Sequence, residues 1–511
     1  MTRAELQALL DTDAEEDLSA RFDETLQFGT AGLRGALGGG PNRMNVAVVR
    51  RASAGVAAWL TRHGRGSNGV VVGYDHRHRS ADFARDTAAV LAAAGIPVRL
   101  ASRPWPTPVT AHSVRSYGAD AGVMVTASHN PAPDNGYKVY DHTGSQIVPP
   151  SDAEIAAAIA AAGPANEIPY DADSPLITSI GTDAIRAYLD DVDGVIGPGP
   201  RDLRVVYTPV HGVGLDVFVA LWKRAGFPDP IVVPEQAQPD PDFPTAPFPN
   251  PEEPHVLDLA LALAEREGAD VVIANDPDAD RLAVAVRDGG ALRVLSGDEL
   301  GWVLGAHQLA VTDGDDRVVA RSIVSSTLLD DMAAAAGVPC RVTPTGFKWI
   351  SRVGDEDGRR LVFGYEEALG YAVSPVVRDK DGLTAALVFA DLAARESIAD
   401  VLSRLAARFG AHATAQWSER VADAAAFTAR IRAHPPTELS GMQLARVHDH
   451  APAVDLIEFL FEPGRVLVRP SGTEPKVKVY FEAIATTVED ARVQVAALRT
   501  AFREYVGSIT P

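Results

Sequence analysis

The chain has 511 residues and a formal net charge of −21, which argues against nucleic acid or an anionic membrane surface as its main partner. The single cysteine, Cys340, excludes an internal disulfide and suits a cytoplasmic protein. The acidic residues 1–22 are unlike a signal peptide, and the apolar runs are too short to span a bilayer. A chain of this length predicts several domains.

Apolar, strand-like runs alternate with Ala- and Leu-rich helical patterns through most of the chain. A first unit has helices predicted at residues 46–60 and 81–93 and strands at 70–74, 97–100 and 122–125. Strands of a second and a third unit are predicted at 203–207, 230–233 and 270–274, and at 317–320, 341–343 and 361–363. Short apolar strands joined by helices favour parallel sheets covered on both faces.

After about residue 410 the pattern changes to closely spaced strands followed by a long helix. The strands are predicted at 456–461, 465–468 and 477–481, and the helix at 487–505. We therefore expect three similar α/β domains with mixed or parallel sheets and a C-terminal α+β domain, divided as 1–200, 201–313, 314–410 and 411–511. The Pro-rich stretch 234–254 is predicted to be a long loop in the second domain.

The most informative segment is Thr126-Ala-Ser-His-Asn-Pro131, which follows a buried-type strand. It presents Ser128 on a Pro-closed loop, and Lys138 follows ten positions later. An exposed Ser in this setting is well placed to be phosphorylated. We expect the adjacent His129 to orient the loop, because an adjacent side chain cannot easily turn back to act as a base. The absence of Gly-x-Ser-x-Gly disfavours a Ser-His-Asp hydrolase.

Three carboxylates, Asp276, Asp278 and Asp280, stand at alternate positions directly after another predicted strand. They repel one another unless a hard cation lies among them, and oxygen ligands favour Mg²⁺ over zinc. An EF-hand does not fit, because Arg281 and Arg287 stand where Gly and Glu are required. A solvated acidic turn is one alternative. Another is an aspartyl-phosphate phosphotransferase with Asp276 as the nucleophile, although this would leave the Ser128 loop without a role.

Further loops carry groups that suit a phosphorylated sugar. The Gly-rich loop 28–35 contains Arg34, and Glu366 and Glu367 are paired acceptors for sugar hydroxyls. The Arg469-Pro-Ser-Gly-Thr473 segment combines an Arg fork with hydroxyls and exposed amides, which suits a phosphate. Lys348 and Lys380 are two of only six lysines, and each lies on a loop. Each loop could alternatively be an ordinary turn, but together they predict one active site formed by every domain.

These motifs resemble those of the α-D-phosphohexomutases, the phosphoglucomutase/phosphomannomutase superfamily, in the same order and over nearly the whole chain. The resemblance implies four domains around a central cleft and a phosphoserine loop with Ser128. It also implies one Mg²⁺ per chain, bound by Ser128, Asp276, Asp278 and Asp280. By the same resemblance Glu366 and Glu367 bind the sugar, and Arg469, Ser471, Gly472 and Thr473 bind its phosphate.

The implied reaction interconverts hexose 1-phosphate and hexose 6-phosphate through a phosphoserine enzyme and a sugar bisphosphate, which also serves as a catalytic activator. Arg34, Lys138, Arg281, Lys348 and Lys380 are expected around the transferred phosphate or the sugar, and Lys138 is the first candidate proton acceptor. Glucose is the first candidate sugar and mannose the second.

Some details point to a particular branch of the superfamily. Many of its members have Ser where Ala368 stands, and the surrounding residues look more like the phosphoglucomutase/phosphopentomutase branch. Phosphopentomutase and glucose-1,6-bisphosphate synthase therefore remain alternatives, as does a non-catalytic sugar-phosphate sensor. We expect a monomer or a small homo-oligomer that binds phosphorylated sugars.

Overall fold

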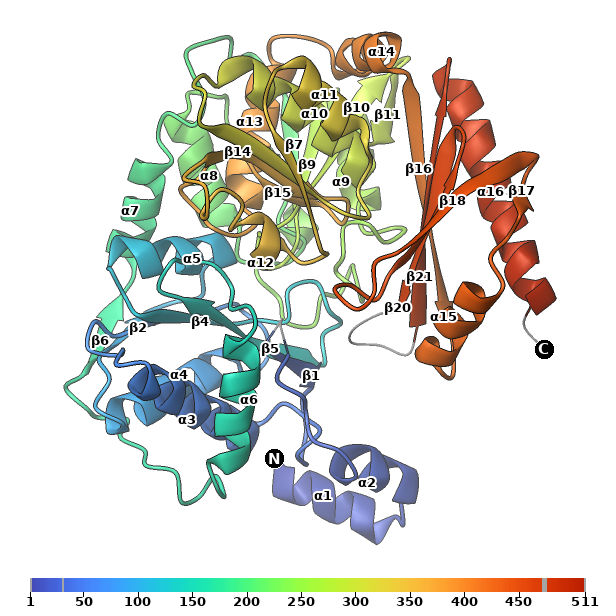
Figure 1. Cartoon of the computed structure of the whole chain (residues 1–511). Helices are drawn as coiled ribbons and strands as arrows, with labels where there is room; N and C mark the ends of the chain where they lie inside the picture. The colour runs from blue at the N-terminus through green and yellow to red at the C-terminus, as the bar shows by residue number, and fades with distance from the viewer. Residues whose placement is uncertain (1, 30–31, 471–475, 510–511) are drawn as a thin grey trace.

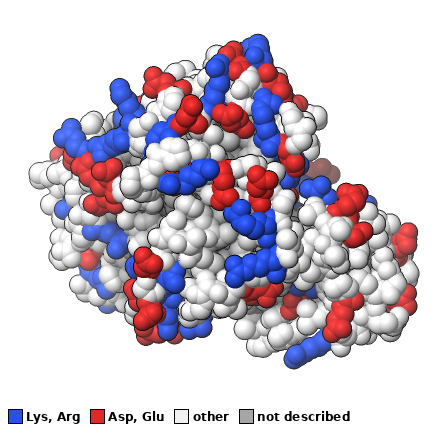
Figure 2. Space-filling model, turned by 90° about the horizontal axis from the view of Figure 1, so that it is seen from above, with Lys and Arg blue, Asp and Glu red and all other residues white. Residues whose placement is uncertain are grey.

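The computed structural model describes residues 2–29, 32–470 and 476–509. The strands in these residues form four sheets, and the fourth lies at one side of the molecule with the C-terminal helix on its outer face (Figure 1). The two N-terminal helices lie apart from the sheets, below the first one in this view. Within these residues no helix is both long and apolar enough to cross a membrane. On the face that Figure 2 shows, basic and acidic side chains are interspersed.

The first sheet has the strand order β1-β5-β4-β2-β3-β6, and β5 runs antiparallel to both of its neighbours. Its central strand β4 is buried along its whole length, as expected for a strand covered on both faces. The strands are β1 (Leu33–Ala36), β2 (Val70–Tyr74), β3 (Val98–Ala101), β4 (Ala121–Val125), β5 (Asp134–Asp141) and β6 (Ile177–Ile180). The helices are α1 (Thr2–Asp11), α2 (Glu15–Phe22), α3 (Val46–Arg62), α4 (Ser80–Ala93), α5 (Thr107–Ser116), α6 (Ser151–Ala161) and α7 (Thr182–Asp191).

The second sheet has the order β11-β10-β9-β7-β8, in which β7, β8 and β9 are parallel and β10 is antiparallel to both neighbours. Its strands are β7 (Val205–Thr208), β8 (Ile231–Val232), β9 (Val271–Asn275), β10 (Leu282–Asp288) and β11 (Ala291–Val294). Its helices are α8 (Leu215–Arg224) and α9 (Asp258–Glu267). The predicted loop 234–254 contains one short 3-10 turn, Pro234–Gln236.

The third sheet has the order β13-β12-β14-β15, with only β15 antiparallel. Gly301 lets α10 approach β14 closely, because an added Cβ would lie 2.5 Å from the Tyr365 ring. The strands are β12 (Arg317–Ser322), β13 (Cys340–Thr343), β14 (Arg360–Glu366) and β15 (Gly370–Ala372). The helices are α10 (Gly297–Val311), α11 (Leu328–Ala335), α12 (Phe347–Ile350), α13 (Gly382–Ala393) and α14 (Ile398–Phe409).

The fourth sheet is antiparallel throughout, in the order β16-β21-β20-β19-β18-β17. Leu498 and Phe502 of the long C-terminal helix are buried in the same core as Phe459 of the sheet. The strands are β16 (Ala411–Arg420), β17 (Glu438–Leu439), β18 (Met442–Asp449), β19 (Ile457–Phe461), β20 (Gly464–Pro470) and β21 (Lys476–Ala485). The helices are α15 (Ala424–Ala433) and α16 (Val488–Ile509).

The predicted fold class of three α/β domains followed by an α+β domain is confirmed. Every strand predicted in the first three units is present, and each of its ends lies within three residues of the predicted position. Nine strands of the described residues were not predicted, namely β1, β5, β6, β10, β11, β15, β16, β17 and β18. Polar residues interrupt β1, β5 and β16, so their pairing in the sheet, rather than a local apolar run, makes these three strands. The division of the chain at 200/201, 313/314 and 410/411 stays a prediction.

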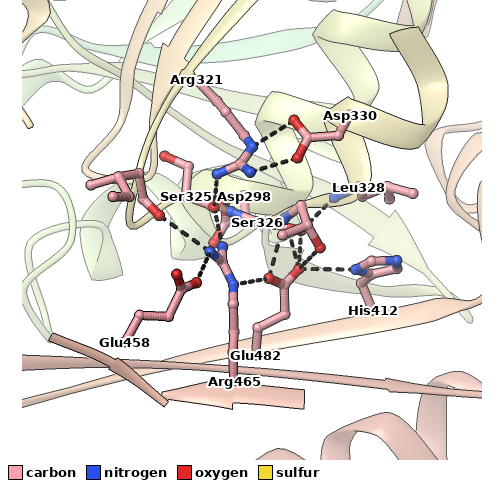
Figure 3. A network of polar contacts seen from close by, with 12 residues as sticks. Asp298, Arg321, Ser325, Ser326, Leu328, Asp330, His412, Glu458, Arg465 and Glu482 are labelled. Atoms are coloured by element: carbon pink, nitrogen blue, oxygen red, sulfur yellow. Dashed lines mark hydrogen bonds and ion pairs between the residues drawn. The ribbon is translucent and has the colours of Figure 1, made fainter. Parts of the chain in front are cut away.

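A buried ion pair on the fourth sheet joins it to the loop after β12 (Figure 3). Arg465 Nε lies 2.7 Å from Glu482 Oε2, and its guanidinium also donates to the carbonyl oxygens of Ile323 and Ser325 at 3.3 and 2.5 Å. Glu482 Oε1 accepts from Ser326 Oγ at 2.5 Å. Both charges are therefore satisfied inside the contact, the condition under which a buried pair is tolerated.

The hydrogen bonds around Glu482 make its charge part of this contact. Burial opposes its ionisation, but the charge of Arg465 and hydrogen bonds from His412 and Ser326 outweigh it and hold the pKa of Glu482 below its usual range. A carboxylate with a lowered pKa stabilises the folded state above its unfolded pKa, about 4.3 for Glu, and loses that contribution as the pH falls towards its folded value.

We expect Glu482→Gln to destabilise the fold at pH 7 by about 3–5 kcal/mol, because it leaves Arg465 buried without its partner. The deficit relative to the wild type should shrink as the pH falls below about 4.3, because the unfolded chain takes up a proton there while folded Glu482 stays charged until a lower pH. Calorimetric Tm values between pH 7 and pH 3 measure this, with exposed Glu489→Gln as the charge-matched control. A deficit that is equal at all pH values would show that the charge is not its source.

Candidate active site

Ser128 follows β4 on a loop whose backbone carbonyls accept hydrogen bonds from the buried side chain of Arg77. Its φ of +53° lies in the left-handed region, which costs energy for a residue with a side chain. The Ser128 amide donates to Thr126 Oγ1 at 2.8 Å, and Arg77 Nη2 donates to the Ser128 carbonyl at 2.6 Å. Arg77 Nη1 also donates to Pro131 O at 2.9 Å. These bonds close the loop around one arginine and fix the Ser128 conformation.

The Ser128 hydroxyl meets the three predicted metal ligands of the second sheet. Ser128 Oγ donates to Asp276 Oδ2 at 2.8 Å, and Asp276, Asp278 and Asp280 are all buried. One ligand atom from each carboxylate lies within 4.8 Å of the others. Among the described residues, Asp278 Oδ1 and Asp280 Oδ1 find no hydrogen-bond donor although both atoms are buried. Buried, unpaired carboxylate oxygens fit a hard cation such as Mg²⁺.

Two lysines bring positive charge to this cluster from other domains. Lys138 Nζ on β5 lies 2.8 Å from Asp278 Oδ2 and 3.0 Å from Asp280 Oδ2. Lys380 Nζ, just before α13, lies 3.2 Å from Asp280 Oδ2. Burial disfavours the Lys138 ammonium, but the two carboxylates outweigh it and raise the pKa of Lys138. This arrangement favours charge neutralisation by Lys138 over proton acceptance, so its role as a base stays an unsupported prediction.

His129 lies closer to Ser128 than expected. Its Nδ1 lies 3.3 Å from Ser128 Oγ, so the adjacent ring does turn back towards the hydroxyl. The left-handed backbone of Ser128 makes this turn possible. Burial, followed by the positive charges of Arg281 and Arg34, lowers the pKa of His129 well below its usual value. The imidazole is therefore neutral beside the hydroxyl.

Two predicted arginines complete this side of the site. Arg34 Nη1 on β1 donates to Asn130 Oδ1 at 3.0 Å, which places its guanidinium against the Ser128 loop. The Arg281 amide donates to Asp276 Oδ1 at 2.9 Å, and its guanidinium donates to the Ala368 carbonyl. Arg281 thereby links the carboxylate cluster to the segment that carries Glu366 and Glu367.

Glu366 and Glu367 lie at and just after the end of β14, and each is held by different donors. Glu366 Oε1 accepts from the Gly346 amide at 2.6 Å. Glu367 Oε2 accepts from the Ser322 and Ser325 hydroxyls at 3.1 and 3.2 Å. Ser325 Oγ in turn accepts from the Glu367 amide at 3.1 Å. Burial, followed by the neighbouring charge of Glu367, raises the pKa of Glu366.

Arg469 lies beside this pair of glutamates. Its Nη1 donates to Thr345 Oγ1 at 2.8 Å, and Thr345 precedes the Gly346 that binds Glu366. Arg469 also donates to the Tyr480 hydroxyl at 3.4 Å. The other residues of the predicted phosphate loop, Ser471, Gly472 and Thr473, lie outside the described residues.

Lys348 occupies a different position from the other predicted cations. It is buried on the short helix α12, with its Nζ 5.3 Å from the centre of the Trp349 ring. Burial lowers its pKa to about 8, and the charges that act on it most are Asp152 and Arg352. The described contacts connect Lys348 with neither Ser128 nor the carboxylate cluster.

Several supporting residues were not predicted. Arg77 holds the Ser128 loop, Thr107 Oγ1 donates to Asp278 Oδ2 at 2.6 Å, and Ser322 and Ser325 hold Glu367. A weak signal existed for Arg77, which follows β2 at the edge where parallel strands present their carboxyl ends. Nothing local in the sequence distinguishes the two serines from other loop serines.

Comparison with known proteins places these features in one family. Four domain models of phosphoglucomutase/phosphomannomutase match in order: α/β/α domain I at residues 25–165, domain II at 186–290, domain III at 296–409 and the C-terminal domain at 413–499. A probable phosphomannomutase of Haemophilus influenzae is 41% identical, covering 88% of this chain and 94% of its own. A probable phosphoribomutase of Schizosaccharomyces pombe is 34% identical, covering 98% and 94%.

A solved structure of similar fold is the phosphoglucomutase/phosphomannomutase family protein of Burkholderia thailandensis. Its TM-score is 0.75 at 20% identity, over 95% of this chain and 97% of that one. This likeness covers all four domains and shows that they are arranged in a known fold.

We expect Ser325→Ala to weaken sugar-phosphate use, because it removes two hydrogen bonds that hold Glu367. A lost hydrogen bond to a charged group is worth about 1.5–3 kcal/mol, so kcat/KM should fall by roughly 10- to 100-fold. The loss should lie mainly in KM, since the Ser128 side of the site is unchanged. Steady-state kinetics measures it, and Thr428→Ala, which removes a buried hydroxyl from α15, is the control. A fall in kcat with an unchanged KM would contradict the role of Ser325 in holding Glu367 for sugar binding.

Proposed function

Because the chain belongs to the phosphoglucomutase/phosphomannomutase family, we propose that it interconverts hexose 1-phosphate and hexose 6-phosphate, with glucose as the first candidate sugar. The observation that carries the proposal is the contact of Ser128 Oγ with Asp276 at 2.8 Å, inside a buried cluster of carboxylates and lysines. A hydroxyl placed there would carry a phosphoryl group beside cations that offset part of its charge. Phosphoryl transfer depends mainly on such positioning and charge neutralisation.

Asp276, Asp278 and Asp280 would hold one Mg²⁺ together with phosphorylated Ser128. Bound there, the ion would neutralise charge on the transferred phosphoryl group. The chain's own cations act beside it: Lys138 and Lys380 balance the carboxylates, and Arg34 approaches the Ser128 loop. The phosphate on Ser128 would therefore be surrounded by the metal ion and by these lysine and arginine side chains.

The reaction begins with the phosphate on Ser128. A hydroxyl of the sugar monophosphate attacks the phosphorus, the bond from phosphorus to Ser128 Oγ breaks, and a sugar bisphosphate forms. The bisphosphate turns within the site, and its other phosphate is transferred back to Ser128. The same bisphosphate, supplied from outside, would phosphorylate an enzyme that has lost its phosphate, which is why we propose it as the activator.

The turn of the intermediate requires a second binding area that accepts either end of the sugar. Glu366 and Glu367 offer acceptors to sugar hydroxyls, and Arg469 lies beside them to bind the phosphate that is not being transferred. We propose that Ser471, Gly472 and Thr473 add donors to that phosphate.

The alternatives concern the sugar and the fate of the bisphosphate. The relatives carry names for both mannose and ribose phosphates at comparable identity, and Ala368 offers no hydroxyl to a sugar. A phosphopentomutase acting on ribose 1- and 5-phosphates is therefore the second candidate. A glucose-1,6-bisphosphate synthase would use the same Ser128 chemistry but would release the bisphosphate.

We expect the Ser128 peptide of the purified enzyme to be about 80 Da heavier than its sequence, because the resting enzyme keeps the phosphate. Ser128→Ala should lower kcat/KM by more than about 10³-fold, whereas exposed Ser116→Ala should leave it unchanged. Mass spectrometry and steady-state kinetics test both. An active Ser128→Ala enzyme would end the proposal.

The sugar is decided by kcat/KM values for glucose, mannose and ribose 1-phosphates, measured side by side with Mg²⁺ and trace bisphosphate. We expect glucose 1-phosphate to have the largest value. Discrimination by one hydroxyl in a polar site can reach about 10⁴-fold, so the ranking should be clear. A larger value for ribose 1-phosphate would establish the pentomutase, and accumulation of free hexose bisphosphate from an acyl-phosphate donor would establish the synthase.

A further inference from the structure

His448, His450 and Glu458 form a cluster of metal-ligating side chains on the fourth sheet. One ligand atom from each, a ring nitrogen from the histidines and a carboxylate oxygen from Glu458, lies within 4.8 Å of the others. The cluster lies on and next to β18 and β19, whereas the predicted Mg²⁺ ligands follow β9 in another domain. It therefore does not belong to the carboxylate cluster that would hold Mg²⁺.

The sheet itself brings these side chains together. His448 pairs directly with Glu458 across the antiparallel strands β18 and β19. His450 is two residues further along, just past the end of β18 at Asp449, and its ring lies on the same side as that of His448. The two imidazole rings have centroids 4.1 Å apart, and His450 Nε2 lies 3.3 Å from Glu458 Oε2. Two histidines separated by one residue, facing a carboxylate across a strand pair, form a chelating set on a rigid support.

Glu458 is held in this position by the ion-pair network of the interface. Its Oε1 lies 3.2 Å from Arg465 Nη1, while Oε2 faces His450. Figure 3 shows Arg465 between Glu458 and Glu482, and its guanidinium also donates to the Ser325 carbonyl. One carboxylate oxygen is thus anchored and the other is turned towards the histidines. Outer partners of this kind orient carboxylate ligands in metal sites.

We propose that His448, His450 and Glu458 bind a divalent transition-metal ion of the Zn²⁺ class. Two imidazole nitrogens and one carboxylate oxygen are donors that suit Zn²⁺, whereas Mg²⁺ prefers oxygen donors alone. His448 is exposed and the side chains of His450 and Glu458 are 18% and 12% exposed, so the ion can enter from solvent. Solvent can also supply the fourth ligand of a tetrahedral site.

Binding of Zn²⁺ at this site should stabilise the folded protein. An ion that binds the folded state alone stabilises it by RT ln(1 + c/Kd), where c is the ion concentration, so the effect rises with the logarithm of c above Kd. The site connects two strands, and through Glu458 and Arg465 it touches the contact between the fourth sheet and the loop after β12. Zn²⁺ should therefore raise the Tm of the wild-type protein, an effect that does not depend on catalysis.

The experiment is calorimetric titration of the full-length protein with Zn²⁺ in excess Mg²⁺, which keeps the predicted Mg²⁺ site filled. We expect one Zn²⁺ site that His448→Ala and His450→Ala each weaken by more than about tenfold. His434→Ala removes an exposed histidine of the same domain and should bind as the wild type does. X-ray absorption of the loaded protein should show a mixed nitrogen and oxygen shell with about two imidazoles.

Two results would overturn the proposal. One is a wild-type protein that takes up no Zn²⁺ under these conditions, and the other is uptake that is equal in the wild type and both variants. A metal-free melting curve shows whether each variant is folded. If His450→Ala, which removes a half-buried side chain, is unfolded, exposed His448→Gln decides the question alone, and the Zn²⁺-dependent rise in Tm should be lost in it.

Discussion

The structure of the site depends on the burial of three like charges together. Asp276, Asp278 and Asp280 are almost fully buried, and their mutual repulsion inside the protein must be balanced by cations. The second domain provides few cations there, so Lys138 and Lys380 come from the domains before and after it in the chain. The same electrostatic demand that prepares the site for a phosphate thereby fixes three domains to one another. A chain of net charge −21 can in this way gather cations from separate domains at one point.

The part of the site around Glu367 depends on hydrogen bonds from one loop rather than on the balance of buried charges. Glu367 is held by Ser322 and Ser325, and the backbone of Ser325 accepts from Arg465 of the fourth domain. The loop after β12 therefore contacts Glu367 through its serine hydroxyls and the fourth domain through the Ser325 carbonyl. Any displacement of the fourth domain, which also carries Arg469, must be accommodated at that loop. The position of Arg469, which we propose to bind the phosphate, and the orientation of Glu367 are coupled by hydrogen bonds and not merely by proximity.

The sequence predicted the groups that do chemistry better than the groups that hold them. Ser128 and the three aspartates were found because a hydroxyl or a cluster of charges on a loop is unusual in itself, and the structure brings them into contact. Arg77 and Ser325 were missed because their importance comes from carbonyls and carboxylates that are remote in the sequence. Lys348 lies against the Trp349 ring, and its expected place beside the transferred phosphate or the sugar stays a prediction. Local patterns identify chemical type, whereas the partner is set by the fold.

Backbone strain gives a further reason why these loops need support. Ser128, Ala279 and Leu369 all have φ between +53° and +60°, and they lie in the phosphoserine, carboxylate and glutamate loops in turn. Such a conformation costs a residue with a side chain about 1–3 kcal/mol, and it persists only where the surroundings compensate. Arg77 compensates at Ser128, and the Ala279 amide donates to Asp276 O at 2.8 Å within its own turn. At Leu369 the carbonyl accepts from the Leu282 amide at 3.1 Å, a bond between the second and third domains. Two of the three strained turns are therefore held by bonds within their own domain, whereas at Leu369 the compensating bond also joins the second domain to the third.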